Sequence, residues 1–125
     1  MKTDETFRKA GFTLVEIMIV VDTIGVLAAI ALPSFIKARA TSQQNACINN
    51  LRQFDAAINQ WAMETGKPSG TTIGSTRTVS AYIRLTSRNR VPRCPAKGTY
   101  VTGSVGDNPQ VSCTLSTAVP PHAMP

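Results

Sequence analysis

The hydrophobic and polar positions divide the chain into stretches with different periodicities. Residues 12–36 are almost uniformly apolar and carry only two ionisable side chains, Glu16 and Asp22. Because a membrane-spanning helix needs roughly 20 apolar residues, this stretch is long enough to cross a bilayer. Gly25 and Pro33 lie within it, so we expect a soft or bent turn in an otherwise continuous helix.

Residues 37–65 remain helical in pattern but become amphipathic. Gly66 and Pro68 predict the end of this helix, because glycine readily adopts the left-handed cap and proline cannot continue a helix. Apolar side chains recur on one face at helical spacing, and this stripe consists of Ala40, Cys47, Leu51, Phe54, Ile58 and Trp61. Such a stripe needs another part of the chain to cover it.

The residues after the helix predict a loop and a small sheet. Residues 66–78 are rich in Ser, Thr and Gly, and residues 98–115 contain two short β-prone runs, GTYVTG and QVSCTL, joined by a turn. We therefore expect an α+β fold, in which a long N-terminal helix packs against a small C-terminal antiparallel β-hairpin. The proline-containing tail predicts a loose end, and we expect its His122 to be solvated.

A specific motif precedes and opens the apolar stretch. A basic pair and a glycine come before Phe12, a glutamate is the fifth residue from that phenylalanine, and a long apolar helix with a proline follows. This segment, RKAGFTLVEIMIVVDTIGVLAAIALPSFIKAR, resembles the N-terminus of the type IV pilin and pseudopilin family. The resemblance implies that residues 1–11 are a leader, that a prepilin peptidase cuts between Gly11 and Phe12, and that the new amino group of Phe12 is methylated. Residues 12–36 would be the transmembrane and fibre-core helix, and residues 37–125 a periplasmic or extracellular head.

The resemblance also implies assembly roles for Glu16, Gly25 and Pro33. Glu16 would meet the amino terminus of a neighbouring subunit, while Gly25 and Pro33 flank a segment that can lose regular structure in the fibre. A carboxylate in an apolar medium is costly alone but much less so beside an ammonium group. Asp22 has no neighbour on its own helix with which to pair, so it is either protonated or meets a polar group of another subunit.

The resemblance leads to the hypothesis of a structural subunit of a type IV pilus or pseudopilus. Its partners would be further copies in a helical filament, the prepilin peptidase, the bacterial inner membrane and the pilus or secretion assembly machinery. It would span the inner membrane once before assembly and then belong to a surface or periplasmic fibre. A pseudopilin of the major secretion type would bind calcium through several carboxylates, but only Asp107 follows Glu64. No catalytic constellation is apparent, so we expect neither a cofactor nor an enzymatic activity.

Two alternatives follow from the same residues. One is a secreted basic binding protein, because AIA at residues 29–31 resembles a signal-peptidase site. The other is a single-pass anchor whose basic head binds an anionic partner. The mature N-terminus separates the three hypotheses: Phe12 indicates the fibre, Leu32 secretion and Met1 the anchor.

The charge pattern suggests an anionic partner for the head. The chain has a formal net charge of +6 at pH 7, and a field of this sign attracts anions in a salt-dependent way. A basic cluster with Tyr82 and Tyr100 at its ends could hold a phosphate backbone and stack bases, as DNA binding requires, or could simply be a solvated face. The cluster comprises Arg84, Arg88, Arg90, Arg93 and Lys97.

The three cysteines, Cys47, Cys94 and Cys113, allow one bridge. A disulfide between Cys94 and Cys113 would close a loop of 20 residues across the hairpin and stabilise the fold by about 3 kcal/mol. Cys47 lies on the predicted apolar stripe and is expected to be an inert core thiol. Together with His122 they could form a zinc set, but no two lie at the close spacing of such sites, so we expect no metal site.

Overall fold

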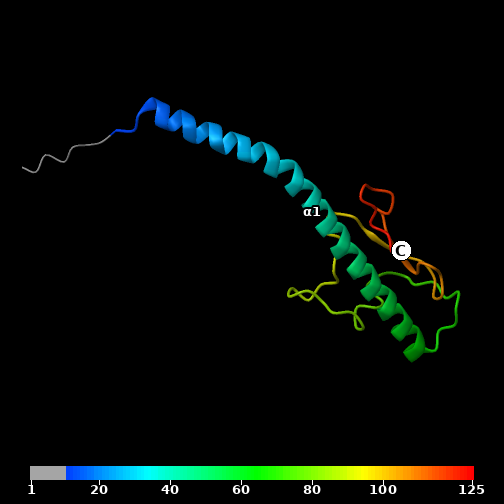
Figure 1. Ribbon diagram of the computed structural model, residues 1–125. Helices are drawn as coiled ribbons and strands as arrows, with labels where there is room; N and C mark the ends of the chain where they lie inside the picture. Colours follow the sequence, from blue (N-terminus) through cyan, green and yellow to red (C-terminus); the bar gives the residue numbers. More distant parts are fainter. Residues whose placement is uncertain (1–10) are drawn as a thin grey trace, which may run out of the picture. The chain divides into compact units, whose positions relative to one another are not determined.

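The computed structural model describes residues 11–125 as one long helix followed by a small sheet (Figure 1). Helix α1 spans Leu14–Thr65, strand β1 spans Tyr100–Thr102 and strand β2 spans Val111–Cys113. The two strands are antiparallel neighbours. This arrangement confirms the predicted α+β fold with a long helix and a small hairpin.

The first of two compact units ends at Lys37. Between residues 11 and 37 every side chain is exposed, apart from the half-buried Ala28. The helix runs through Pro33 without interruption, although proline removes one backbone donor and crowds the carbonyl four residues earlier. By length and composition this part of α1 can cross a membrane. Exposure of so many apolar side chains to water is unfavourable, so this part of α1 requires lipid or another chain to cover it.

The C-terminal end of α1 has the predicted glycine cap. Gly66 adopts a φ of 63°, a left-handed conformation that glycine reaches at little cost. The Gly66 amide donates to the Met63 carbonyl at 3.4 Å, and the Lys67 amide donates to the Ala62 carbonyl at 2.9 Å. These two bonds form a Schellman motif, which satisfies carbonyls that the helix itself leaves unpaired.

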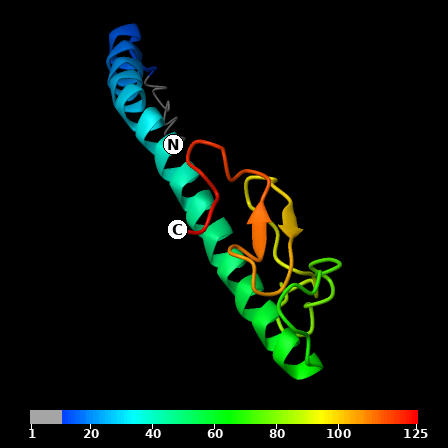
Figure 2. The same cartoon turned by 90° about the vertical axis from the view of Figure 1, so that its right-hand side faces the viewer.

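The second unit, Ala38–Pro125, forms its core on the amphipathic part of α1. The later residues of the chain lie along this part of the helix in both views (Figures 1 and 2). Of the predicted stripe, four members are fully covered, namely Cys47, Leu51, Phe54 and Ile58. Trp61 packs at the margin, while Ala57 and Ala62 extend the buried face. The second half of α1 is therefore amphipathic as predicted.

The hairpin is larger than its two strands suggest. Tyr100 pairs with Cys113 and Thr102 with Val111, and Thr72 forms an isolated bridge with Ser104. Around that bridge the Ile73 amide donates to Gly103 and the Val105 amide donates to Thr71, at 3.0 and 2.9 Å. Part of the predicted 66–78 loop thus extends the sheet. The sequence did not predict this pairing, because the loop contains no β-prone run.

The C-terminal tail is not a loose end, and the predicted solvation of His122 is wrong. His122 is only 4% exposed, and its backbone amide donates to the Leu115 carbonyl at 3.0 Å. Gln44, on α1, donates from Nε2 to the Pro121 carbonyl at 2.8 Å. These long-range bonds hold the tail to the head, and a lack of periodicity in the tail could not predict them.

Replacing Phe54 with alanine should destabilise the head. The ring is fully buried and lies 5.2 Å, centroid to centroid, from the ring of Tyr100. We expect the free energy of unfolding to fall by about 3 to 5 kcal/mol, because the cavity cannot collapse fully. Denaturant unfolding of the full chain in detergent, followed by Trp61 fluorescence, measures this. The exposed Ala56→Ser change is the control, and equal midpoints for the two variants would contradict the assigned core.

Candidate functional site

The start of α1 carries a capping box that the sequence analysis missed. The Glu16 backbone amide donates to Thr13 Oγ1 at 3.2 Å, so Thr13 caps the helix. In return the Thr13 amide and hydroxyl donate to Glu16 Oε2 at 3.2 and 3.3 Å. The signal was the Thr-x-x-Glu spacing before an apolar run. Within residues 11–125 these bonds use one carboxylate oxygen, and a carboxylate has capacity for further donors on the other.

The predicted cleavage site lies directly before this cap. Gly11 and Phe12 are both exposed and precede the first turn of α1, so the peptide bond between them is outside the helix. The Phe12 side chain is 82% exposed. The basic pair and the rest of the predicted leader, residues 1–10, lie outside the described residues. The geometry leaves the Gly11–Phe12 bond accessible, and its cleavage stays a prediction.

The other predicted assembly residues are also on the surface of the first unit. Gly25 has open space where a side chain would be, and Pro33 lies within the continuous helix. Asp22 is exposed among apolar neighbours, and both alternatives for its role remain open. Their roles in assembly stay predictions.

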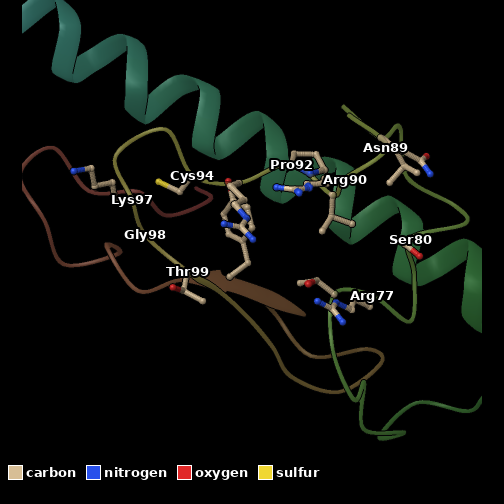
Figure 3. A pocket seen from close by; sticks show the side chains of 14 residues that line it. Arg77, Ser80, Asn89, Arg90, Pro92, Cys94, Lys97, Gly98 and Thr99 are labelled. Carbon is tan, nitrogen blue, oxygen red and sulfur yellow. The ribbon is translucent and has the colours of Figure 1, made fainter. Parts of the chain in front are cut away.

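A basic pocket lies in the head, between residues 76–85 and 89–100 (Figure 3). It encloses about 1170 Å³ and none of the described residues that line it is acidic. Its basic side chains are Arg77, Arg90, Arg93 and Lys97. Such a concentration of like charge in a concave surface attracts anions.

The pocket contains part of the predicted basic cluster. Arg90, Arg93 and Lys97 line it, whereas Arg84 and Arg88 do not. Arg77 joins them from the loop after α1, and nothing in its sequence neighbourhood marked it. Anion binding by this cluster stays a prediction.

The structure brings Cys47, Cys94, Cys113 and His122 together. Their ligand atoms, three Sγ and one imidazole nitrogen, all lie within 4.8 Å of one another, and all four residues are buried. The Sγ of Cys94 is 3.3 Å from Nδ1 of His122. The wide sequence spacing that argued against such a set did not prevent its formation, because four different segments converge in the head.

Two thiols of this group have opposite pKa shifts. Burial raises the pKa of Cys47 to about 12, although a hydrogen bond from Tyr100 acts in the other direction. Burial also acts to raise the pKa of Cys94, but hydrogen bonds from the Ala96 and Gly98 amides and from Cys47 outweigh it and lower the pKa. Cys94 is therefore the more readily ionised of these two thiols.

The three cysteines are free thiols in the structure. The Sγ atoms of the predicted pair, Cys94 and Cys113, lie within 4.8 Å of each other. Disulfide formation would require them to approach to about 2 Å. The bridge stays a prediction, and it competes with any other use of these sulfurs.

Comparison with known proteins identifies pilin relatives. The type IV major pilin protein PilA of Myxococcus xanthus (strain DK1622) is 47% identical over 62 residues, which cover 50% of this chain and 28% of that protein. A type IV major fimbrial protein FimA of Dichelobacter nodosus is 34% identical over 104 residues, covering 78% and 67%. The type II secretion system core protein G of Klebsiella pneumoniae is 27% identical over 118 residues, covering 83% and 81%.

The extent of these matches differs between relatives. The chain covers less than half the length of the Myxococcus pilin and of a second Dichelobacter FimA, of which it covers 38%. No family model matches the chain, and no solved structure matches it. The 34% identity with the longer-matched Dichelobacter protein nevertheless extends over two thirds of that protein and well beyond the apolar helix. On this relationship, together with the fold, the chain belongs to the type IV pilin and pseudopilin family.

Proposed function

We propose that this chain is a structural, non-catalytic subunit of a type IV pilus or pseudopilus. The observation that carries the proposal is the exposed first half of α1, with one capped carboxylate, Glu16, at its start. Leu14 and Ile30 are 74% and 72% exposed, and Phe12, just before the helix, is 82% exposed. Apolar surface of this extent is stable only in lipid or against other helices, and a filament core supplies the second environment after the membrane has supplied the first.

The proposed maturation prepares the same helix for assembly. A prepilin peptidase would cut the accessible bond after Gly11 and methylate the amino group of Phe12. Glu16 would then accept a hydrogen bond from the amino group of Phe12 of a neighbouring subunit, in addition to those from its own Thr13. A charge pair in an apolar core selects one axial register, because any other offset leaves both charges unpaired. Gly25 would permit close approach of neighbouring helices, and Pro33 would mark where the helix loosens.

The proposed location follows from the same helix. Before assembly, the subunit would be a single-pass protein of the bacterial inner membrane. The assembly machinery would then transfer it into a surface or periplasmic fibre. The secreted alternative is less well supported, because its mature N-terminus, Leu32, lies in the middle of α1. A peptidase would need to unwind the helix there, whereas the Gly11–Phe12 bond lies outside it.

The mature N-terminus tests the proposed function. We expect chains recovered from cells to begin at Phe12 and to carry one additional methyl group, as measured by intact mass and N-terminal sequencing. In cells that lack the prepilin peptidase, the chain should retain residues 1–11. A mature chain beginning at Leu32 or Met1 would instead indicate the secreted protein or the simple anchor.

Glu16→Gln should prevent assembly while preserving the helix. Glutamine can still complete the capping box with Thr13, so the change removes the charge and little else. Loss of one partner of a buried ion pair costs about 3 to 5 kcal/mol, and we expect fibre number to fall by more than tenfold. Electron microscopy of fibres and immunoblots of the membrane pool measure the effect.

Glu64→Gln is the matched control for that change, because Glu64 lies near the far end of α1 and is exposed. Equal fibre numbers in the two variants, at equal membrane abundance, would show that Glu16 has no special role.

We further propose that the basic pocket binds the phosphate backbone of DNA. The observation in favour is the convergence of Arg77, Arg90, Arg93 and Lys97 around one cavity without an acidic lining residue. Tyr100 also lines the pocket, but its ring packs against Phe54 in the core, so the proposal rests on the basic side chains. This would be an additional property of a fibre subunit and requires no change in the assembly proposal.

Arg90→Ala should weaken DNA binding more than Arg84→Ala. Both changes remove one positive charge from the same segment, but only Arg90 lines the pocket. Loss of one phosphate contact should lower the slope of log affinity against log salt by about one. Fluorescence anisotropy of labelled DNA with the full chain in detergent, over a salt series, measures both. Equal slopes for the two variants, or binding insensitive to salt, would exclude the pocket as the site.

A further inference from the structure

The cluster of Cys47, Cys94, Cys113 and His122 has the composition of a metal site. Three thiols and one imidazole form a Cys₃His set, which in proteins holds zinc in tetrahedral coordination. All four residues are almost completely buried, with exposed fractions of 0%, 5%, 2% and 4%. The four ligand atoms lie within 4.8 Å of one another. In a tetrahedron with metal–ligand bonds of about 2.0 to 2.3 Å, ligand atoms are separated by roughly 3.3 to 3.8 Å, so only small side-chain movements are required.

We propose that these four residues bind one Zn²⁺ ion as a structural site. Each ligand comes from a different part of the head: Cys47 from α1, Cys94 from the turn before β1, Cys113 from β2 and His122 from the tail. With four protein ligands, no coordination position is left for water or substrate. The site therefore joins segments and does not catalyse a reaction.

The surroundings of the sulfurs support metal binding. The Tyr100 hydroxyl donates to Cys47 Sγ at 3.6 Å, and Asn50 Nδ2 donates to that hydroxyl at 3.1 Å. Donors of this kind orient thiolate ligands and compensate their negative charge. Cys47 thus already has an outer shell of hydrogen-bond donors, in which Asn50 orients Tyr100 and Tyr100 donates to the sulfur.

Gly98 keeps the space around Cys113 open. A Cβ atom at this position would lie 2.6 Å from Cys113 Sγ. The two atoms would overlap at this distance, so any residue other than glycine would displace the sulfur. Lys97, which precedes it, adopts a φ of 68°, and a left-handed conformation is uncommon for a residue other than glycine. The turn after Cys94 therefore has a specific conformation that leaves room for the sulfur of Cys113.

The charge balance of the head also fits a zinc–thiolate centre. Three thiolates, one neutral imidazole and Zn²⁺ carry a net charge of −1. Arg93 and Lys97 line the same pocket as Cys94, so positive charge is close to the centre. Zinc displaces one proton from each thiol that it binds, and no oxidant or reductant is needed.

A Cys94–Cys113 disulfide is the competing chemistry. It would use two of the four groups and leave Cys47 and His122 buried beside it without a covalent role. Zinc uses all four groups, and each of them has its ligand atom in the cluster. The arrangement of His122, which adds nothing to a disulfide, is the observation that favours the metal.

Metal content of the full chain tests the proposal directly. The chain is purified in detergent under reducing conditions, stripped with a chelator, reloaded with Zn²⁺ and dialysed. Elemental analysis should find one zinc ion per chain. Reloading with Co²⁺ should produce the strong visible absorption of tetrahedral cobalt–thiolate coordination. A reduced, folded chain that retains no metal would overturn the proposal, as would a Cys94–Cys113 disulfide found in chains taken directly from cells.

Substitution of single residues identifies the ligands. Loss of an outer-shell partner costs about 10- to 100-fold in metal affinity, so Tyr100→Phe should fall in this range. His122→Ala and Cys113→Ser remove ligands and should cost more than 100-fold, with loss of the cobalt spectrum. Ser112→Ala, next to Cys113 on β2, is the control and should bind as the parent does. Far-UV circular dichroism checks folding, and unchanged zinc affinity in folded His122→Ala would exclude the Cys₃His site.

Discussion

The apolar stripe on the second half of α1 is the constraint on which the head depends. Leu51, Phe54 and Ile58 must be removed from water, and the chain has only short strands and loops with which to cover them. Burial of apolar area is non-directional, so irregular segments can supply it provided their own backbone groups are satisfied. The bridge of Thr72 with Ser104 and the bonded tail meet that second condition.

The first half of α1 obeys the same hydrophobic effect in a different environment. None of the described residues of its own unit covers it, since residues 11–37 are exposed almost without exception. A helix of this kind satisfies its backbone internally and can therefore pass from lipid to a bundle of helices without losing hydrogen bonds. Glu16 and Asp22 are the exceptions to its apolar character. The capping box of Glu16 with Thr13 shows how one carboxylate can serve the helix terminus while retaining acceptor capacity.

The small sheet leaves the head in need of further cross-links. Three-residue strands contribute few ladder bonds, and a small domain buries a limited fraction of its surface. The convergence of Cys47, Cys94, Cys113 and His122 in the buried interior of the second unit supplies a point at which four segments can be joined. The same turn that carries Cys94 also lines the basic pocket, so the conformation of that pocket depends on how the cysteine is held.

The sequence by itself determined the features that arise from local rules. Helical spacing predicted the stripe on α1, Gly66 predicted its end, and β-prone runs predicted the hairpin, because each depends on residues near in the chain. Only the tertiary structure decided the burial of His122, the addition of Arg77 to the basic pocket and the meeting of the three cysteines with one imidazole. These residues are far apart in sequence, and their proximity follows from how loops and tail cover the stripe. The course of the loops and tail cannot be predicted from periodicity or spacing, because it depends on the packing of the whole head.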